Sequence, residues 1–257
     1  MLQQISHWFD LYTLLFVGIG FAAQMCDGAL GMGFGVISST VLTFIGLPRE
    51  IVSATVNGAK IFTGAASSVS HLFYKNIQWT ALTVLAVGGL AGGLTGAWLL
   101  TQGSNKLVGP IVSCYLIVVG AYIIWRTSHV ERLQITMPRT AGVGIAAGFL
   151  EAVAGVWGPL ATSNLVAFGL PARIAIGIGN IAETIVAVAV FTVLVHHIGF
   201  DQLSRSAFGL VIGALAASPI AAKLTANISK RRLTVGVGIM VILSSLLRLA
   251  RDFGLFS

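Results

Sequence analysis

The residues Asp27–Gly35, with the sequence DGALGMGFG, form a glycine-rich turn between two apolar stretches. A related turn, EAVAGVWGP, occupies Glu151–Pro159 in the second half of the chain and also begins with an acidic residue. Residues around the turns correspond at a constant offset of 123 positions: Gly35 with Gly158, Gly46 with Gly169, Pro48 with Pro171, Asn57 with Asn180, and Lys60 with Glu183. We therefore predict two copies of one unit, with a binding site between them.

Composition indicates where these copies lie. Hydrophobic residues make up 56% of the 257 positions, charged residues make up 9%, and the mean hydropathy is +0.93. This is too apolar for a soluble domain with a polar surface. Runs close to the roughly 20 residues that a helix needs to cross a bilayer cover 51–73, 79–100, 107–125, 173–195, 204–224 and 233–250. The sequence thus predicts an all-α, polytopic membrane protein.

The two turns interrupt apolar segments at 11–46 and 140–169. Each arm of these segments is about 14 to 17 residues long, which is short for a full span. Paired, glycine-interrupted segments of this kind mark the binding site of a transporter, because irregular backbone within a membrane is tolerated where it lines a cavity. We predict two re-entrant helical hairpins, each followed by three full spans. The first repeat would comprise 1–126, a cytoplasmic linker 127–139, and an inverted second repeat 140–257.

Lys and Arg lie between the predicted spans and form no exposed stripe, so the net charge of +7 reflects membrane topology and not a nucleic-acid partner. On this topology, eight basic residues lie in the cytoplasm: Lys75, Arg126, Arg132, Arg139, Lys223, Lys230, Arg231 and Arg232. Six lie outside: Arg49, Lys106, Arg173, Arg205, Arg248 and Arg251. The positive-inside rule then places both termini outside.

Both turns have features of an anion-binding site. Glycines let the backbone approach a ligand, and the helix after each turn begins with unpaired N–H groups and the positive end of its dipole. Hydroxyl residues follow both turns at corresponding positions, and one tryptophan lies within the second turn. The predicted substrate-binding residues here are Gly31, Gly33, Gly35, Ser39, Thr40, Gly155, Trp157, Gly158, Thr162 and Ser163. For any one glycine or serine, close helix packing is the alternative.

The next span of each copy adds polar groups three residues apart, Asn57 with Lys60 and Asn180 with Glu183. Ionisable groups within an apolar span should face protein or water, so all four residues are candidates for substrate or ion binding. Lys60 and Glu183 would approach the axis between the repeats. They form either a structural ion pair, or a site at which Lys60 binds an anion while a carboxyl group carries a coupling proton. The candidates for that proton are Asp27, Glu151 and Glu183.

Together these motifs resemble the TauE/SafE family of sulfite-exporter-like permeases, over residues of about 14–250. The resemblance is carried by both turns, by the Gly-Leu-Pro segments at 46–48 and 169–171, and by Ala-Glu-Thr at 182–184. It implies a carrier in the inner membrane for sulfite, a sulfonate or another organic anion. Lys60 stands where members of one similar-looking subgroup tend to have a carboxylate, which favours an anionic substrate.

We predict a secondary transporter with alternating access, importing or exporting. The sequence has no phosphate-cradling loop, no His-Glu-x-x-His helix and no Gly-x-Ser-x-Gly turn, so we expect no enzyme and no cofactor. His71, His196 and His197 lie near span ends and complete no recognisable metal set. A homo-oligomer is left open. One alternative is a passive anion channel; another is a divalent-metal carrier that uses the carboxylates, although Lys60 would repel the cation.

Overall fold

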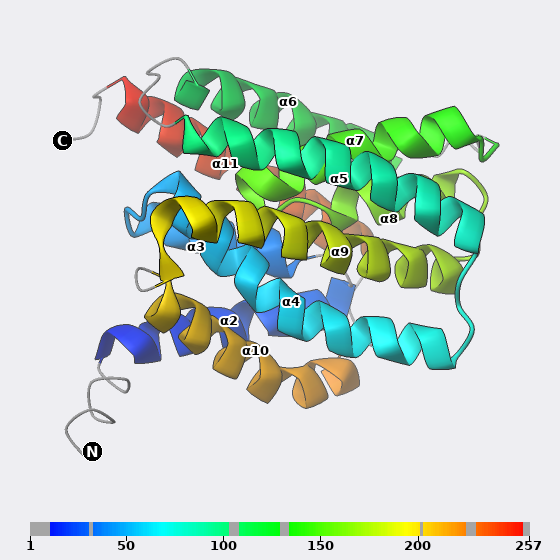
Figure 1. Cartoon of the computed structure of the whole chain (residues 1–257), viewed down its shortest axis with the longest axis horizontal. Helices are drawn as coiled ribbons and strands as arrows, with labels where there is room; N and C mark the ends of the chain where they lie inside the picture. Colours follow the sequence, from blue (N-terminus) through cyan, green and yellow to red (C-terminus); the bar gives the residue numbers. More distant parts are fainter. Residues whose placement is uncertain are drawn as a thin grey trace.

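The computed structural model describes residues 11–30, 33–102, 108–128, 134–200, 203–224 and 230–253. These residues form helices and no strand, which confirms the predicted all-α class (Figure 1). In chain order the helices are α2 (Leu11–Leu30), α3 (Phe34–Phe44), α4 (Arg49–Phe73), α5 (Trp79–Thr101), α6 (Val108–Ser128), α7 (Met137–Ala154), α8 (Gly158–Ala167), α9 (Ala172–Ile198), α10 (Ser204–Leu224) and α11 (Lys230–Asp252).

Two helices, α3 with 11 residues and α8 with 10, are much shorter than the others. At 1.5 Å per residue they reach about half of the roughly 30 Å thickness of a bilayer core. The helix before each is longer, with 20 residues in α2 and 18 in α7. The sequence predicted arms of similar length. Each hairpin instead joins one long arm to one half-length helix, and both short helices begin at a buried residue, Phe34 or Gly158.

The remaining helices occupy the ranges that were expected to form full spans, and their ends differ from the expected ends by at most three residues. By length and apolar composition alone, α5 and α9 are able to cross a membrane. Helix α4 is more polar than these two and holds Arg49, Glu50 and Lys60. The division into repeats at 1–126 and 140–257, with the linker 127–139, stays a prediction.

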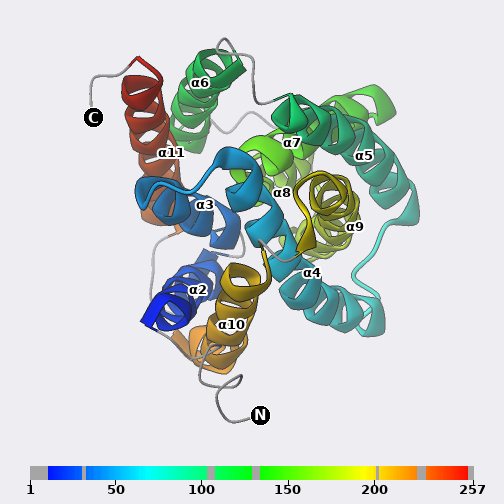
Figure 2. The same cartoon turned by 60° about the vertical axis from the view of Figure 1, so that its left-hand side comes forward.

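Helix packing follows a reciprocal pattern (Figures 1 and 2). The long arm of the first hairpin, α2, packs along α10, and the long arm of the second, α7, packs along α5. Glycines allow these contacts: Gly213 of α10 lies against the backbone of Val17, and Gly92 of α5 lies against the backbone of Ile145. Each hairpin is therefore held by a helix from the other half of the chain, and α6 pairs with α11 in the same crosswise manner.

The centre of the molecule is an antiparallel pair, α4 and α9 (Figure 2). Contacts join residues whose order is reversed between the two helices: Gly58 with Phe191, Gly64 with Thr184, and His71 with Gly177. Short links connect α3 to α4 and α8 to α9. Because α4 and α9 run in opposite directions, the two half-length helices reach the centre from opposite sides. This is the arrangement that an inverted repeat would produce.

Two apolar cores flank the central pair. The larger is formed mainly by α5, α7, α8 and α9 and contains Leu150 and Trp157. The smaller is formed by α2, α3, α4 and α10 and contains Phe16 and Leu210. The polar site described below lies between them, where α4 faces α9.

Candidate functional site

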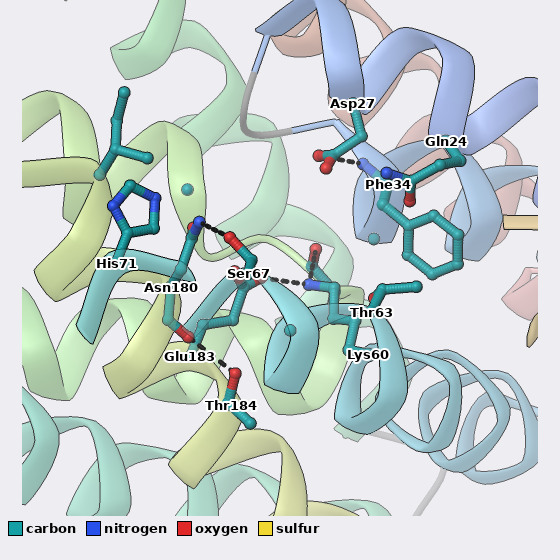
Figure 3. Close-up of a pocket in the computed structure, with 15 residues that line it drawn as sticks. Gln24, Asp27, Phe34, Lys60, Thr63, Ser67, His71, Asn180, Glu183 and Thr184 are labelled. Carbon is teal, nitrogen blue, oxygen red and sulfur yellow. Dashed lines mark hydrogen bonds and ion pairs between the residues drawn. The ribbon is translucent and has the colours of Figure 1, made fainter. Parts of the chain in front are cut away.

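A cavity of about 290 Å³ lies where the two turns meet the middle of α4 and α9 (Figure 3). Its volume is at the lower end of the roughly 300 to 1,000 Å³ of ligand pockets, which suits a small ligand. Residues from α2, α3, α4, α9 and the second turn form its wall: Gln24, Asp27, Phe34, Gly35, Lys60, Thr63, Gly64, Ser67, His71, Gly155, Gly158, Ile176, Asn180, Glu183 and Thr184.

Lys60 is the centre of a buried charge cluster. Its Nζ lies 2.7 and 2.8 Å from the two carboxylate oxygens of Glu151 and 2.7 Å from Oε1 of Glu183. The carbonyl oxygen of Gly155 lies 3.4 Å from the same nitrogen. The structure thus brings Lys60 and Glu183 together, as expected, and adds Glu151, whose contact with Lys60 the sequence did not predict. With all three groups ionised, the cluster has a formal charge of −1.

The two carboxylates of this cluster differ in exposure. The Glu151 side chain is completely buried, whereas the Glu183 side chain is 23% exposed and lines the cavity. Glu151 also contacts Lys60 through both oxygens, but Glu183 contacts it through one. Glu151 is therefore the fixed partner of the ammonium group, and Glu183 is the partner that a ligand entering the cavity could replace.

Asp27 lies near the end of α2, and its carboxylate reaches the start of α3. Its Oδ1 accepts hydrogen bonds from the backbone N–H groups of Gly33 (2.6 Å) and Phe34 (2.9 Å). A carboxylate at this position satisfies unpaired donors and interacts favourably with the helix dipole. The N–H groups that were expected to bind an anion at the first turn are thus already bound by the protein. At the start of α8, by contrast, Gly158 lines the cavity, and no hydrogen bond to its N–H occurs within the described residues.

The two turns touch each other through glycines. Gly155 has the left-handed backbone angle φ +70°, which side chains rarely adopt. A methyl group on Gly155 would come within 2.6 Å of Ser39 Oγ, and one on Gly35 would overlap the Gly155 carbonyl oxygen and the Lys60 ammonium group. Glycine at both positions lets the turns pack directly against Lys60.

Polar residues continue from the cluster along one face of α4, at Thr63, Ser67 and His71. On the facing helix, the Asn180 amide donates to Ser67 Oγ over 2.7 Å. The spacing of three to four residues from Lys60 is the sequence signal that could have identified this face. His71 was expected near the end of its span, as part of no metal set, and it lines the cavity. Within the described residues, no group of three or more His, Cys, Asp or Glu is arranged to hold a metal ion.

The cavity lies on one side of the charge cluster. On α4, every residue from 52 to 60 is buried, whereas Thr63, Ser67 and His71 are partly exposed. Asn57, one turn before Lys60, is completely buried, and its amide donates to Ser53 O of its own helix (2.9 Å). The cavity therefore extends towards the end of α4 that holds His71, and the side towards Arg49 is closed.

The predicted site residues fall into two groups. Those that line the cavity are Gly35, Lys60, Gly155, Gly158, Asn180, Asp27 and Glu183. Those not among its lining residues are Gly33, Ser39, Thr40, Asn57, Trp157, Thr162, Ser163 and Glu151, and Gly31 lies outside the described residues. Any role of either group in substrate or proton binding stays a prediction.

Trp157 was predicted to bind substrate in the second turn, but it is not among the residues that line the cavity. Its side chain is 1% exposed and belongs to the larger apolar core, and its indole N–H donates to the Gly179 carbonyl over 3.0 Å. The ring also packs close to Gly89. Trp157 does lie in the turn between α7 and α8, but its side chain packs into the core, because a large apolar ring with one polar atom is stable in a core that supplies an acceptor.

Arg248 corrects a second expectation. It was counted as a topology marker outside the membrane, yet it is 5% exposed. Its Nη2 donates to Thr43 Oγ1 and to the Ser39 carbonyl oxygen of α3. An arginine that points into the protein says nothing about which side of the membrane its loop occupies, so the positive-inside count loses one residue from its outer side.

Comparison with known proteins identifies the family. The profile described as "Sulfite exporter TauE/SafE" matches residues 16–247. The probable membrane transporter protein YtnM of Bacillus subtilis is 31% identical over 240 residues, which cover 90% of this chain and 80% of YtnM. A probable membrane transporter protein of Methanocaldococcus jannaschii is 21% identical, covering 91% of this chain and 94% of its own. No solved structure matches. The chain therefore belongs to the Sulfite exporter TauE/SafE family, and it is a membrane transporter and not an enzyme.

Proposed function

We propose that this protein is a proton-coupled secondary transporter of a small anion, such as sulfite or a sulfonate, which binds in the cavity beside Lys60. The observation that carries the proposal is the Lys60 ammonium group at the cavity wall, shared between a buried carboxylate and a partly exposed one. The family description supplies the substrate class. The arrangement of carboxylates around Lys60 supports the coupling of anion transport to a proton.

Charge balance links the anion to a proton. Asp27, Glu151 and Glu183 are three carboxylates beside one ammonium group, so the fully ionised site would repel an anion. Asp27 is stabilised by the N–H groups of α3, and Glu151 is stabilised by Lys60. Glu183 is the carboxylate that can accept a proton from water in the cavity. Once protonated it no longer holds Lys60 as an ion pair, and an oxygen of the substrate takes its place.

The second turn provides further donors for the same ligand. The N–H of Gly158 begins α8 at the cavity wall, where the positive end of the helix dipole favours negative charge. The hydroxyl groups of Thr63 and Ser67 and the Asn180 amide lie along the same wall. A tetrahedral anion with several oxygens could thus contact Lys60 and these donors together.

The position of the site supports alternating access. The cavity reaches one end of the α4–α9 pair, and the other side of Lys60 is buried. The two apolar cores meet at this pair, so a change in their relative position would close one side and open the other. We place the protein in the inner membrane with both termini outside, consistent with the predicted distribution of Lys and Arg.

Flux measurements on proteoliposomes test this proposal. Acidifying the outside should drive labelled sulfite or a sulfonate inward against its own gradient. Glu183→Gln should bind or exchange the anion but lose the response to the pH step, since it cannot exchange a proton. Glu50→Gln, in the first turn of α4 and away from the cavity, is the matched control and should behave as wild type.

Three outcomes would count against the proposal. Equilibration without accumulation at any pH step indicates a passive anion channel. Uptake of Ni²⁺ or Mn²⁺ with no anion flux indicates a divalent-metal carrier. Accumulation by Glu183→Gln that follows the pH step as in wild type would remove this carboxyl group from the coupling.

A further inference from the structure

Buried polar groups also lie on the closed side of Lys60. Ser39 is on α3, one turn beyond Gly35, and its Oγ faces Gly155, on which a methyl group would approach it to 2.6 Å. The carbonyl oxygen of Gly155 contacts Lys60 Nζ on the other side of the turn. Ser39 thus lies at the contact between the two turns, whose glycines Gly35 and Gly155 line the cavity.

These groups lack the hydrogen bonds that buried polar atoms normally make. Ser38, Ser39 and Asn57 are at most 1% exposed. Within the described residues, no partner is found for Ser38 Oγ, Ser39 Oγ or Asn57 Oδ1. An unpaired polar atom in an interior costs free energy, and groups of them require an explanation such as a ligand. These polar groups would gain hydrogen-bonding partners if, in another conformation of the protein, the polar substrate passed along them. Such a route explains why the closed side of Lys60 is not lined by apolar residues.

A second cation lies further along the same side. Arg248 of α11 is 5% exposed and donates to the Ser39 carbonyl oxygen and to Thr43 Oγ1. Thr43 is four residues beyond Ser39, about 6 Å along α3. A charged residue buried between helices of a membrane protein is a functional candidate by default, and the guanidinium group binds planar or tetrahedral oxyanions through several N–H donors.

From this juxtaposition we infer that Ser38, Ser39, Asn57 and Arg248 form the closed half of the substrate route, in which Arg248 is the second cationic contact of the anion. The inference rests on the proposed function. When the two turns separate at Gly35 and Gly155, the anion leaves Lys60, passes the hydroxyl groups of α3 and meets Arg248 near the far end of that helix.

Cysteine accessibility tests the inference in the full-length protein. In a Cys26→Ala/Cys114→Ala background, Ser39→Cys is treated with two membrane-impermeant methanethiosulfonates, one with a sulfonate group and one with a trimethylammonium group. Lys75→Cys, in the exposed link after α4, marks the face on which the cavity opens. We expect Ser39→Cys to react from the opposite face, about tenfold faster with the anionic reagent because a buried cation attracts it.

Control variants separate charge from general opening of the helices. Ser113→Cys on α6 is equally buried and also has an unpartnered Oγ; it should stay unlabelled by both reagents. Adding Arg248→Lys to Ser39→Cys should retain the preference for the anionic reagent, and adding Arg248→Gln should remove it. Gel filtration in detergent identifies any variant that has not folded. The comparison of the anionic and cationic reagents on Ser39→Cys, with Arg248 unchanged, tests the inference without any substitution of Arg248.

Two results would overturn the inference: Ser39→Cys unlabelled from both faces, or labelled at equal rates by the two reagents. If proton-driven sulfonate flux is present in the parent protein while either result is obtained, the proposed function stands and this route is wrong. If the parent shows no anion flux but Ser39→Cys reacts as expected, the substrate assignment fails while the anion-selective route is retained.

Discussion

Asp27 and Glu151 begin the two glycine-rich turns, yet their carboxylates bind different partners. Asp27 accepts from the N–H groups of Gly33 and Phe34 at the start of its own half-length helix. Glu151 reaches across to Lys60 in α4. The second copy has Glu183 where the first has Lys60. One copy thus supplies the cation and the other supplies both of its counter-charges.

Because their carboxylates bind different groups, the two turns differ in how much of their hydrogen-bonding capacity is left for a ligand. The first turn is complete in itself, because its acid satisfies its own helix. The second turn leaves the start of α8 at the cavity and uses its acid to hold the ammonium group. Two copies of one motif can therefore form a single asymmetric site, in which we expect the first turn to act mainly as a scaffold and the second to contact the ligand.

Of the substitutions that test this difference between the turns, removal of the Lys60 cation should have the largest effect on transport and stability. Lys60→Ala leaves Glu151 buried without its partner, which typically costs about 3 to 5 kcal/mol. We expect no measurable anion flux and a large fall in melting temperature in detergent. Lys75→Ala, at an exposed lysine, is the control. Anion flux at the wild-type rate in Lys60→Ala would refute the central role of the charge cluster.

The backbone of the second turn should be the next most sensitive feature. Gly155→Ala places a side chain at φ +70° and against Ser39 Oγ and Gly35, a strain of about 1 to 3 kcal/mol. Transport assays and thermal melting should both show a loss. Gly142→Ala, in α7 with no atom within 4 Å of the added methyl group, should be neutral. A neutral Gly155→Ala would mean that the turns are not held in contact.

The two acids offer a direct test of their unequal roles. Glu151→Gln weakens a charge-assisted contact to Lys60, and hydrogen bonds to charged groups contribute about 1.5 to 3 kcal/mol. Asp27→Asn keeps an acceptor at the start of α3 and should cost about 1 kcal/mol or less. Flux and melting temperature should both rank Asp27→Asn above Glu151→Gln. The reverse order would assign the ligand to the first turn.

The paired asparagines should give the smallest effects. Asn180 lines the cavity and donates to Ser67, whereas Asn57 is buried and binds Ser53 of its own helix. Losing one such hydrogen bond costs about 1 kcal/mol. We expect Asn180→Ala to raise KM for the anion a few-fold with kcat retained, and Asn57→Ala to lower the melting temperature. A raised KM in Asn57→Ala with an unchanged KM in Asn180→Ala would contradict binding of the anion in the cavity beside Asn180.

Sequence patterns predicted the helical ranges well, because long apolar runs and glycine-rich breaks report directly on burial. They also predicted the encounter of Lys60 with Glu183, since the offset of 123 gave these residues equivalent positions. They did not predict the partners of Asp27 and Glu151, because small differences in the turns decide whether a carboxylate reaches its own helix or another. They misjudged Arg248 and Trp157, because position along a helix does not specify the direction in which a side chain points.

The crosswise packing of α2 with α10 and of α7 with α5 has a consequence for biogenesis. The start of α10 is synthesised about 170 residues after the end of α2, a delay of about 10 to 30 s at 5 to 20 residues per second. During that interval Gly20, which packs against the backbone of Leu210, has no α10 to meet. The nascent first half therefore waits in the bilayer incompletely packed, a stage at which insertases or lipids could hold it until the last helices arrive.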